Sequence, residues 1–216
     1  MSRKGSPAEF REWITGHLDP LDTSILGGMQ VRGDLNLDPA DATDDARVWT
    51  PAAVLVGLVE REHGYSVLLT RRADTLRNHT GQVAFPGGRC DPGETPWETA
   101  LREAQEEIGL DPAHVELAGL SNPYRTAVTG YQIMPVVGFL SPDMQLTPSP
   151  AEVAEIFETP FGFLMDPSNL EPQERRGPNG DMRRFYAATW EGQYIWGATA
   201  GMLRALYDRL YGAAVA

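Results

Sequence analysis

Residues 88–110 constrain the structure of this chain more than any other stretch. Thr95 can cap a helix that starts at Pro96, and Gly109 can end it. At 3.6 residues per turn, the apolar side chains of this helix form one narrow stripe, made of Trp97, Leu101, Ala104 and Ile108. The opposite face carries three carboxylates, those of Glu103, Glu106 and Glu107. We therefore predict a helix with one buried face and one acidic face.

The spacing of these three glutamates makes them repel, by about 0.2–0.5 kcal/mol per pair in an isolated helix. A solvated acidic face is the simpler interpretation. Three neighbouring features favour a metal site instead. Arg102 could hold one carboxylate in place, Glu94 adds a fourth, and the sequence from Phe85 to Gly88 predicts a tight exposed turn. Clustered hard oxygens are the ligands that Mg²⁺ or Mn²⁺ prefers.

The spacing of Gly88, Glu94 and the run from Arg102 to Leu110 resembles a complete Nudix box. The resemblance implies a metal-dependent hydrolase that splits a diphosphate linked to another moiety. It also implies a Nudix-type α/β/α sandwich, with a mixed central sheet and a loop–helix–loop metal site.

The same resemblance implies roles for the residues of the box. Glu103 and Glu107 would bind Mg²⁺ or Mn²⁺, with help from Glu106. The backbone carbonyl of Gly88 would be a further ligand, and Arg102 would orient the glutamates.

The rest of the chain also favours an α/β fold. Ser6 to Glu9 has the pattern of a capping box, and we expect the helix that follows to end at Asp19 and Pro20. We expect residues 1–48 to form this helix and a loop-rich arm, and residues 49–216 to form the hydrolase domain of one globular unit. Strands are predicted at 51–59, 65–70, 115–120, 131–140, 152–158, 184–190 and 193–196. Helices are predicted at 161–164 and 199–210, and polar loops or turns at 121–130, 141–150 and 171–181.

Charge and composition restrict the partners. A formal net charge of -12 argues against general binding to nucleic acid or to an anionic membrane. Cys90 is the only cysteine, so no intramolecular disulfide can form. Residues 1–18 have no signal pattern, and the longest apolar runs have the length of strands. We expect a cytoplasmic protein.

The residues before the box indicate a substrate. The run from Leu68 to Ala73, then Arg77, then the run from Phe85 to Gly88 are similar to a motif of the coenzyme A pyrophosphatase branch of the family. Ala73 departs from that motif, which often has Ser there. The run from Ile195 to Thr199 also looks like that branch. The resemblance implies hydrolysis of coenzyme A, with its acyl and oxidised forms as further substrates, to 3′,5′-ADP and 4′-phosphopantetheine.

Arg72 and Arg77 are the candidate substrate-binding residues. Either guanidinium could bind phosphate oxygens in paired fashion, and we expect one of them to hold the 3′-phosphate of coenzyme A. The alternative is that both arginines make structural ion pairs, for example with Asp74 or Asp91.

The base that accepts a proton from the attacking water has three candidates, Glu106, Glu152 and Glu155. We favour Glu152, because a Glu-Val pair after a proline-rich loop resembles the coenzyme A branch. A solvated loop carboxylate is the alternative interpretation of Glu152.

Other functions stay open on the sequence alone. The same box chemistry could act on ADP-ribose, another dinucleotide or a nucleoside triphosphate. A non-catalytic domain that senses a nucleotide is an alternative of another class, but the box keeps all its glutamates and no basic module is visible. The N-terminal and C-terminal helices could support a homodimer.

Overall fold

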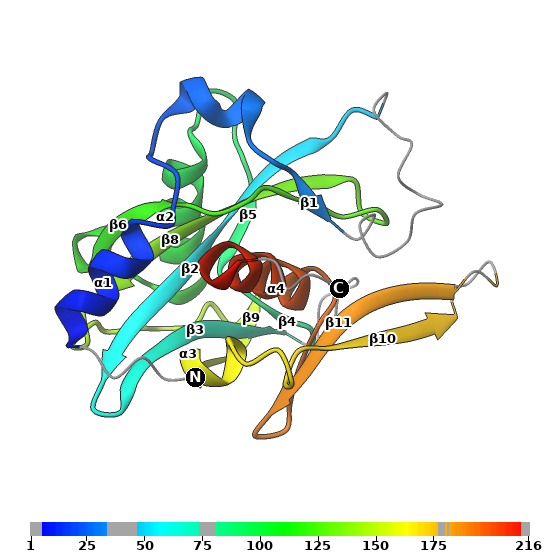
Figure 1. The fold of residues 1–216 in the computed structure, drawn as a ribbon. Helices are drawn as coiled ribbons and strands as arrows, with labels where there is room; N and C mark the ends of the chain where they lie inside the picture. The colour runs from blue at the N-terminus through cyan, green and yellow to red at the C-terminus, as the bar shows by residue number, and fades with distance from the viewer. Residues whose placement is uncertain (1–5, 34–46, 74–80, 177–179, 181, 213–216) are drawn as a thin grey trace.

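The strand β2 (Thr50–Arg61) lies in the middle of a nine-stranded sheet in the computed structural model (Figure 1). The model describes residues 6–33, 47–73, 81–176, 180 and 182–212. Strand β2 pairs in parallel with β8 (Tyr131–Leu140) and antiparallel with β3 (Gly64–Arg72), so the sheet is mixed, as predicted. The strand order is β1-β7-β8-β2-β3-β4, with β5 on β2, β6 on β8 and β9 on β3.

The remaining strands of this sheet are short or lie at its edges. They are β1 (Arg32–Gly33), β4 (Val83–Ala84), β5 (Gly87–Arg89), β6 (Val115–Leu120), β7 (Tyr124–Arg125) and β9 (Val153–Pro160). A separate three-stranded sheet contains β10 (Glu171–Arg176), β11 (Met182–Trp190) and β12 (Gln193–Trp196).

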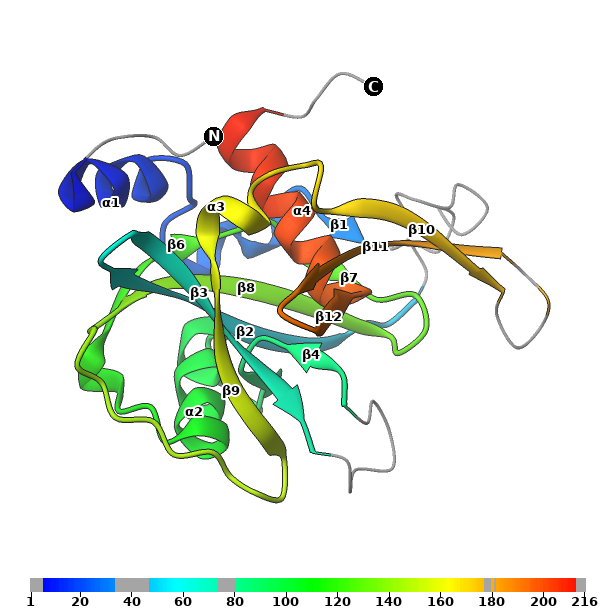
Figure 2. The same cartoon turned by 90° about the horizontal axis from the view of Figure 1, so that it is seen from below.

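Helices cover both faces of the large sheet (Figure 2). The four α-helices are α1 (Pro7–Thr15), α2 (Pro96–Ile108), α3 (Phe161–Leu164) and α4 (Ala198–Tyr211) among the described residues. The connections that the structure describes contain 3₁₀ helices at Thr23–Gly28 and Pro112–His114. Within the described part of the chain, no helix has both the length and the apolar character needed to cross a membrane.

Two hydrophobic cores explain why β2 is apolar along most of its length. On one face, Val56 and Leu58 belong to a cluster with Leu203 of α4. On the other face, Leu55 packs in a cluster with Ala104 of α2. A strand that is buried on both sides has no polar face, so its sequence is a continuous apolar run instead of an alternating one.

Helix α1 ends earlier than predicted. Its capping box at Ser6 and Glu9 is present, but the helix stops at Thr15 and not at Asp19 and Pro20. The C-cap is Gly16, and glycine is a poor helix former. The N–H of His17 then donates to the carbonyl of Ile14, a tighter bond of the 3₁₀ type.

Two predicted polar loops are wrong. Residues 121–130 contain β7, which pairs with both β1 and β8 and is largely buried there. Residues 171–176 form β10, whose every residue is exposed and which pairs along its full length with β11. In both cases, pairing with a distant strand orders a segment that has no apolar pattern of its own.

Candidate functional site

Helix α2 forms for the reasons expected from its sequence. The Thr95 side chain accepts from the N–H of Glu98, and the Glu98 side chain accepts from the N–H of Thr95, which completes a capping box. Gly109 ends the helix in the left-handed conformation, with a φ of 66°. Ala104 and Ile108 lie fully buried against the sheet. The helix is therefore fixed at both ends and along one side.

The predicted acidic face is only partly exposed. Glu106 has a side-chain exposure of 60%, but Glu103 keeps 17% and Glu107 only 6%. The prediction that all three glutamates face away from the buried side is wrong for Glu107. Strand β5 pairs with residues 52–54 of β2 and packs against α2, so it extends the covered side of the helix as far as Glu107.

The buried carboxylate of Glu107 has few partners. Its Oε2 accepts from the N–H of Gly87 at 3.1 Å, and its Oε1 lies 3.9 Å from Nη1 of Arg72. Burial is the main cause that raises the pKa of Glu107, and the negative charges of Glu103 and Glu152 also raise it. Against the opposing effects of the Gly87 N–H and Arg72, the resulting pKa is about 7. The protein alone therefore stabilises the negative charge of the Glu107 carboxylate poorly, which is typical of a carboxylate that binds a cation.

Gly88 lies directly against Glu103. A Cβ at position 88 would lie 2.6 Å from Cδ and Oε1 of Glu103. Burial raises the pKa of Glu103, while the nearby guanidinium of Arg102 lowers it. The missing side chain of Gly88 thus leaves room for a carboxylate against the backbone of β5.

Arg102 joins the loop to the helix. Its Nε and Nη2 donate to the two oxygens of Glu94 at 2.8 and 3.0 Å, and its Nη1 donates to Glu103 at 2.9 Å and to Glu106 at 3.4 Å. Hydrogen bonds from Arg102 hold the pKa of Glu94 at about 2, with a further contribution from the N–H of Asp91. We call Glu94, Glu103, Glu106 and Glu107 the acidic cluster. The contacts of Arg102 suit the orienting role predicted for it, which stays a prediction.

The candidate bases differ in their surroundings. Glu152 is exposed in the turn just before β9, and its charge raises the pKa of both Glu103 and Glu107, so it lies near the acidic cluster. Glu155 is held by Nε of Arg71 at 3.3 Å and by Nε2 of Gln193 at 3.0 Å. Two side chains therefore hold the Glu155 carboxylate in place.

Of the two predicted substrate-binding arginines, the structure describes Arg72 but not Arg77. Arg72 forms an ion pair with Glu107, and within the described residues it forms none with Asp91. The buried Nε of Arg72 has no hydrogen-bond partner within the described part of the chain. Arg77 and Asp74 lie outside the described residues. Arg72 therefore has one donor to spare beside the acidic cluster.

The donor set suits a small hard cation. In the described ranges, no three Asp, Glu, His or Cys side chains form a metal-binding group by themselves. Two carboxylates, Glu103 and Glu107, lie beside the backbone of Gly87 and Gly88. Mg²⁺ usually keeps several waters and binds through one or two carboxylates plus substrate phosphates. Two carboxylates fit that pattern better than they fit a closed metal cage.

Sequence reasoning missed the part that Gly87 plays. Its N–H binds Glu107, and its φ of 154° brings it so close to β2 that a Cβ there would lie 2.3 Å from the carbonyl oxygen of Ala53. The tight exposed turn predicted from Phe85 to Gly88 is wrong, because Phe85 and Pro86 are buried and Gly87 and Gly88 belong to β5. The Phe-Pro-Gly-Gly sequence was the available signal, but it did not show which carboxylate this segment would contact.

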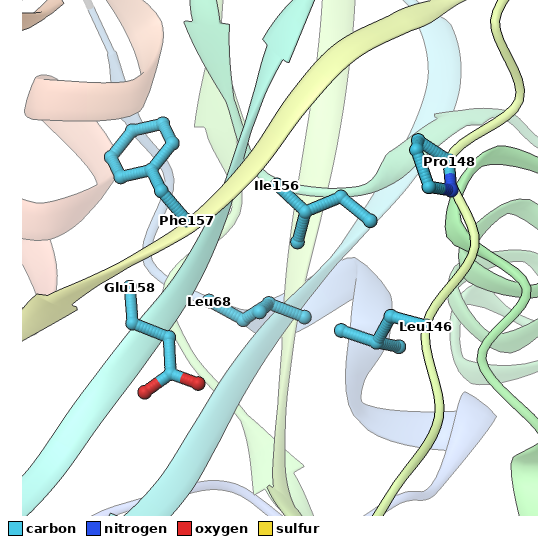
Figure 3. Close-up of a pocket in the computed structure, with 6 residues that line it drawn as sticks. All are labelled: Leu68, Leu146, Pro148, Ile156, Phe157 and Glu158. Atoms are coloured by element: carbon cyan, nitrogen blue, oxygen red, sulfur yellow. The ribbon is translucent and has the colours of Figure 1, made fainter.

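An open groove of about 570 Å³ lies elsewhere, along β3 and β9 (Figure 3). It is lined by Leu68, Leu146, Pro148, Ile156, Phe157 and Glu158. None of these is a predicted site residue, and Glu158 is already bound by Arg61 through two hydrogen bonds of 2.5 and 3.0 Å. The groove is therefore separate from the acidic cluster.

Comparison with known proteins identifies related chains. A family model described as the NUDIX domain matches residues 48–188, a range that contains the whole acidic cluster. A protein of Escherichia coli O7:K1 described as "Uncharacterized Nudix hydrolase NudL" is 42% identical over 158 residues, which cover 72% of this chain and 80% of the relative. A protein of the same description from Enterobacter sp. strain 638 is also 42% identical, with the same coverage.

Two of the similar solved structures match about half of the chain. The C. elegans Ap4A hydrolase binary complex has a TM-score of 0.45 at 20% identity, covering 51% of this chain and 80% of that chain. The hydrolase RenU from M. smegmatis has a TM-score of 0.44 at 24% identity, covering 54% and 74%.

Proposed function

Because this chain belongs to the Nudix family of hydrolases, we propose that it hydrolyses the diphosphate bond of coenzyme A to 3′,5′-ADP and 4′-phosphopantetheine. Membership of the family makes it a pyrophosphohydrolase, and the choice of coenzyme A is the proposal. One observation carries that choice. The segment from Leu68 to Gly88, which resembles the coenzyme A branch, lies against the acidic cluster: its Arg72 is 3.9 Å from Glu107, and the N–H of its Gly87 donates to Glu107.

Nudix hydrolases generally need a divalent cation, and we assign Mg²⁺ or Mn²⁺ to Glu103 and Glu107. The carbonyl oxygen of Gly88 is the proposed backbone ligand, and Glu106 assists from the exposed side of the helix. When bound, the cation neutralises charge on the diphosphate and lowers the pKa of the attacking water.

Arg72 supplies the fixed positive charge of the site. Its position next to Glu107 puts the guanidinium within reach of phosphate oxygens that lie over the acidic cluster. We therefore assign Arg72 to the diphosphate itself, where a paired contact both orients the substrate and stabilises charge that develops during in-line attack. The role of Arg77 stays the one inferred from its sequence position.

Glu152 is the proposed base. It is exposed, it lies near Glu103 and Glu107, and its backbone carbonyl is fixed by the N–H of Ala73 at 2.8 Å. The side chain can therefore accept a proton from water near the acidic cluster while its main chain stays in place. Glu155 is held by Arg71 and Gln193, which makes it the weaker candidate.

Product analysis tests the proposed function. Purified protein is incubated with coenzyme A, ADP-ribose and dGTP in Mg²⁺, and the products are separated by chromatography. We expect coenzyme A to be cleaved with the highest kcat/KM and to give the two named products. Faster cleavage of ADP-ribose or dGTP would replace coenzyme A as the substrate while leaving the diphosphatase chemistry intact. The Glu107→Gln protein serves as the control for contaminating activity.

A further inference from the structure

The small sheet β10–β11–β12 extends away from the body of the protein beside β4 (Figures 1 and 2). Because side chains alternate between the faces of a sheet, its two faces differ in composition. One face is covered: Ala188 and Ile195 lie in the core, and Arg204 of α4 lies over the ring of Tyr186 at 5.3 Å. The other face carries three aromatic side chains and two arginines, together with Glu171, Gln173, Thr189 and the buried Ala187. We call it the aromatic face, consisting of Arg175, Arg183, Phe185, Tyr194 and Trp196.

The rings of the aromatic face contact one another. Phe185 and Trp196 meet edge to face with centroids 5.5 Å apart, and Tyr194 is near-parallel to Trp196 at 6.3 Å. The hydroxyl of Tyr194 donates to Gln173 at 2.8 Å, which fixes a ring that remains 42% exposed. Phe185 and Trp196 are half-buried. Ordered aromatic rings with part of their surface accessible are the kind of surface on which nucleic acid bases stack.

The arginines of the aromatic face lie opposite each other. Arg175 and Arg183 are direct partners in the register of β10 and β11, an arrangement in which like charges destabilise a hairpin. Arg175 has no ion-pair partner in the described part of the chain. On the covered side of the hairpin, by contrast, Arg184 is paired with Glu174 at 2.8 Å. The protein as a whole has a net charge of -12. Two arginines opposite each other therefore place positive charge on an otherwise acidic protein, which suits the binding of an anion.

A short series of contacts links the aromatic face to the acidic cluster. Trp196 precedes Gly197, and a Cβ on Gly197 would lie 3.7 Å from Nε2 of Gln82. The carbonyl of Gln82 accepts from the N–H of Arg72 at 3.0 Å, and the Arg72 side chain reaches Glu107. The aromatic face thus begins beside the strand that carries the proposed diphosphate contact.

We propose that the aromatic face binds the nucleoside part of the substrate, with the base stacked on Trp196 and Tyr194. Arg175 and Arg183 then bind a phosphate on the ribose, which in coenzyme A is the 3′-phosphate. This inference rests on the proposed function for the identity of that phosphate. A planar base and a dianion are the two groups that exposed rings and paired guanidinium groups recognise together.

Binding of 3′,5′-ADP tests the inference without turnover. Dissociation constants are measured by isothermal titration calorimetry for the unmodified protein and for Trp196→Leu and Tyr194→Leu. We expect each change to weaken binding about fivefold to a hundredfold, the range that base stacking contributes. Arg184→Ala, on the other face of the same hairpin, is the matched control and should bind normally. Unchanged binding in both ring variants overturns the proposal, and Tyr194→Leu keeps the test valid if Trp196→Leu does not fold.

The arginines are tested by the ratio of kcat/KM for coenzyme A to that for dephospho-coenzyme A. Arg175→Ala should lower this ratio about tenfold or more, through a higher KM for coenzyme A and little change in kcat. An unchanged ratio overturns the phosphate contact. If the unmodified protein cleaves ADP-ribose and not coenzyme A, the proposed function fails, but the ring variants still decide base stacking through their KM for ADP-ribose.

Discussion

The carboxylate of Glu103 occupies the space that a side chain at position 88 would need. A Cβ on Gly88 would lie 2.6 Å from Cδ of Glu103, closer than two such atoms can approach. The glycine and the glutamate therefore depend on each other, because any larger residue at position 88 must displace a proposed metal ligand.

Gly88→Ala should lower turnover by about 10²-fold or more, the cost of misplacing a catalytic group by about 1 Å. The fold should stay, since Gly88 has an ordinary backbone conformation. Steady-state kinetics at saturating Mg²⁺ would check this, with circular dichroism to follow folding. Gly28→Ala is the control, because a Cβ at Gly28 meets nothing within 4 Å. Normal turnover in Gly88→Ala would show that the site tolerates a shifted Glu103.

Glu103→Gln and Glu107→Gln should each lower turnover by at least about 10²-fold, the effect of losing one key electrostatic group. Glu98→Gln is the control, because it makes the same chemical change on the same helix. Glutamine also suits the capping box at this position, so the turnover of this variant should be normal. Turnover is measured across a Mg²⁺ titration. A Glu103→Gln protein that reaches normal turnover at high Mg²⁺ would argue against direct ligation.

The burial of Glu107 should make the metal-free protein more stable at lower pH. Because its pKa in the folded state is about 7, above the ordinary value of 4.5, the folded protein holds a proton that the unfolded chain releases in this range. The free energy of unfolding should therefore fall as the pH rises from about 4.5 to about 7, by up to about 3 kcal/mol at 1.36 kcal/mol per pH unit.

Urea unfolding in EDTA at several pH values measures this effect. The difference between the unmodified protein and Glu107→Gln isolates the contribution of Glu107 from other titrating groups. At pH 8 the variant should be the more stable of the two without metal, and adding Mg²⁺ should stabilise only the unmodified protein appreciably. Parallel pH profiles for the two proteins would mean that the folded protein does not raise this pKa.

Glu152→Gln should lower kcat with little change in KM, because a proton acceptor acts in the transition state. The loss should shrink at raised pH, where hydroxide takes over the role of the base. The comparison variant is Glu155→Gln, which should have a smaller effect because Arg71 and Gln193 already bind that carboxylate. If Glu152→Gln is silent and Glu155→Gln or Glu106→Gln is not, the role belongs to that other residue.

Arg72→Ala should lower kcat/KM about tenfold to a hundredfold, as expected for the loss of a charge-assisted contact of about 1.5–3 kcal/mol. Since the contact is to the diphosphate, coenzyme A and dephospho-coenzyme A should be affected equally. Arg72→Lys should recover only part of the activity, because lysine cannot make the paired contact. A selective loss of the preference for coenzyme A would assign Arg72 to the 3′-phosphate, as its sequence position first suggested.

The helix of the site was predictable because its signals are local. Thr95 and Gly109 mark its ends through bonds to residues a few positions away, so no distant part of the chain can change them. The burial of Glu107 was not predictable in this way. Helical periodicity gives the angle of each side chain around the axis, but it does not say that β5 will lie over one edge of the apolar stripe.

The hairpin was missed for a related reason. Residues 171–176 are polar and fully exposed, so no alternation of apolar residues indicates a strand. Strand β10 exists because its backbone pairs with β11, and that register is a property of the folded chain. The contact between Arg72 and Glu107 also depends on pairing, since it needs β3 and β5 to lie along the same edge of β2, opposite β8.

Arg102 binds Glu94 and Glu103 at the same time, and this has a consequence for how tightly a cation can be held. Long side chains such as these lose up to about 2 kcal/mol of rotamer entropy when they are fixed. Here that loss occurs when the protein folds, before any cation arrives. Replacing Arg102 would leave every ligand oxygen in the chain, yet it would weaken cation binding because the free protein would gain disorder that binding must then remove.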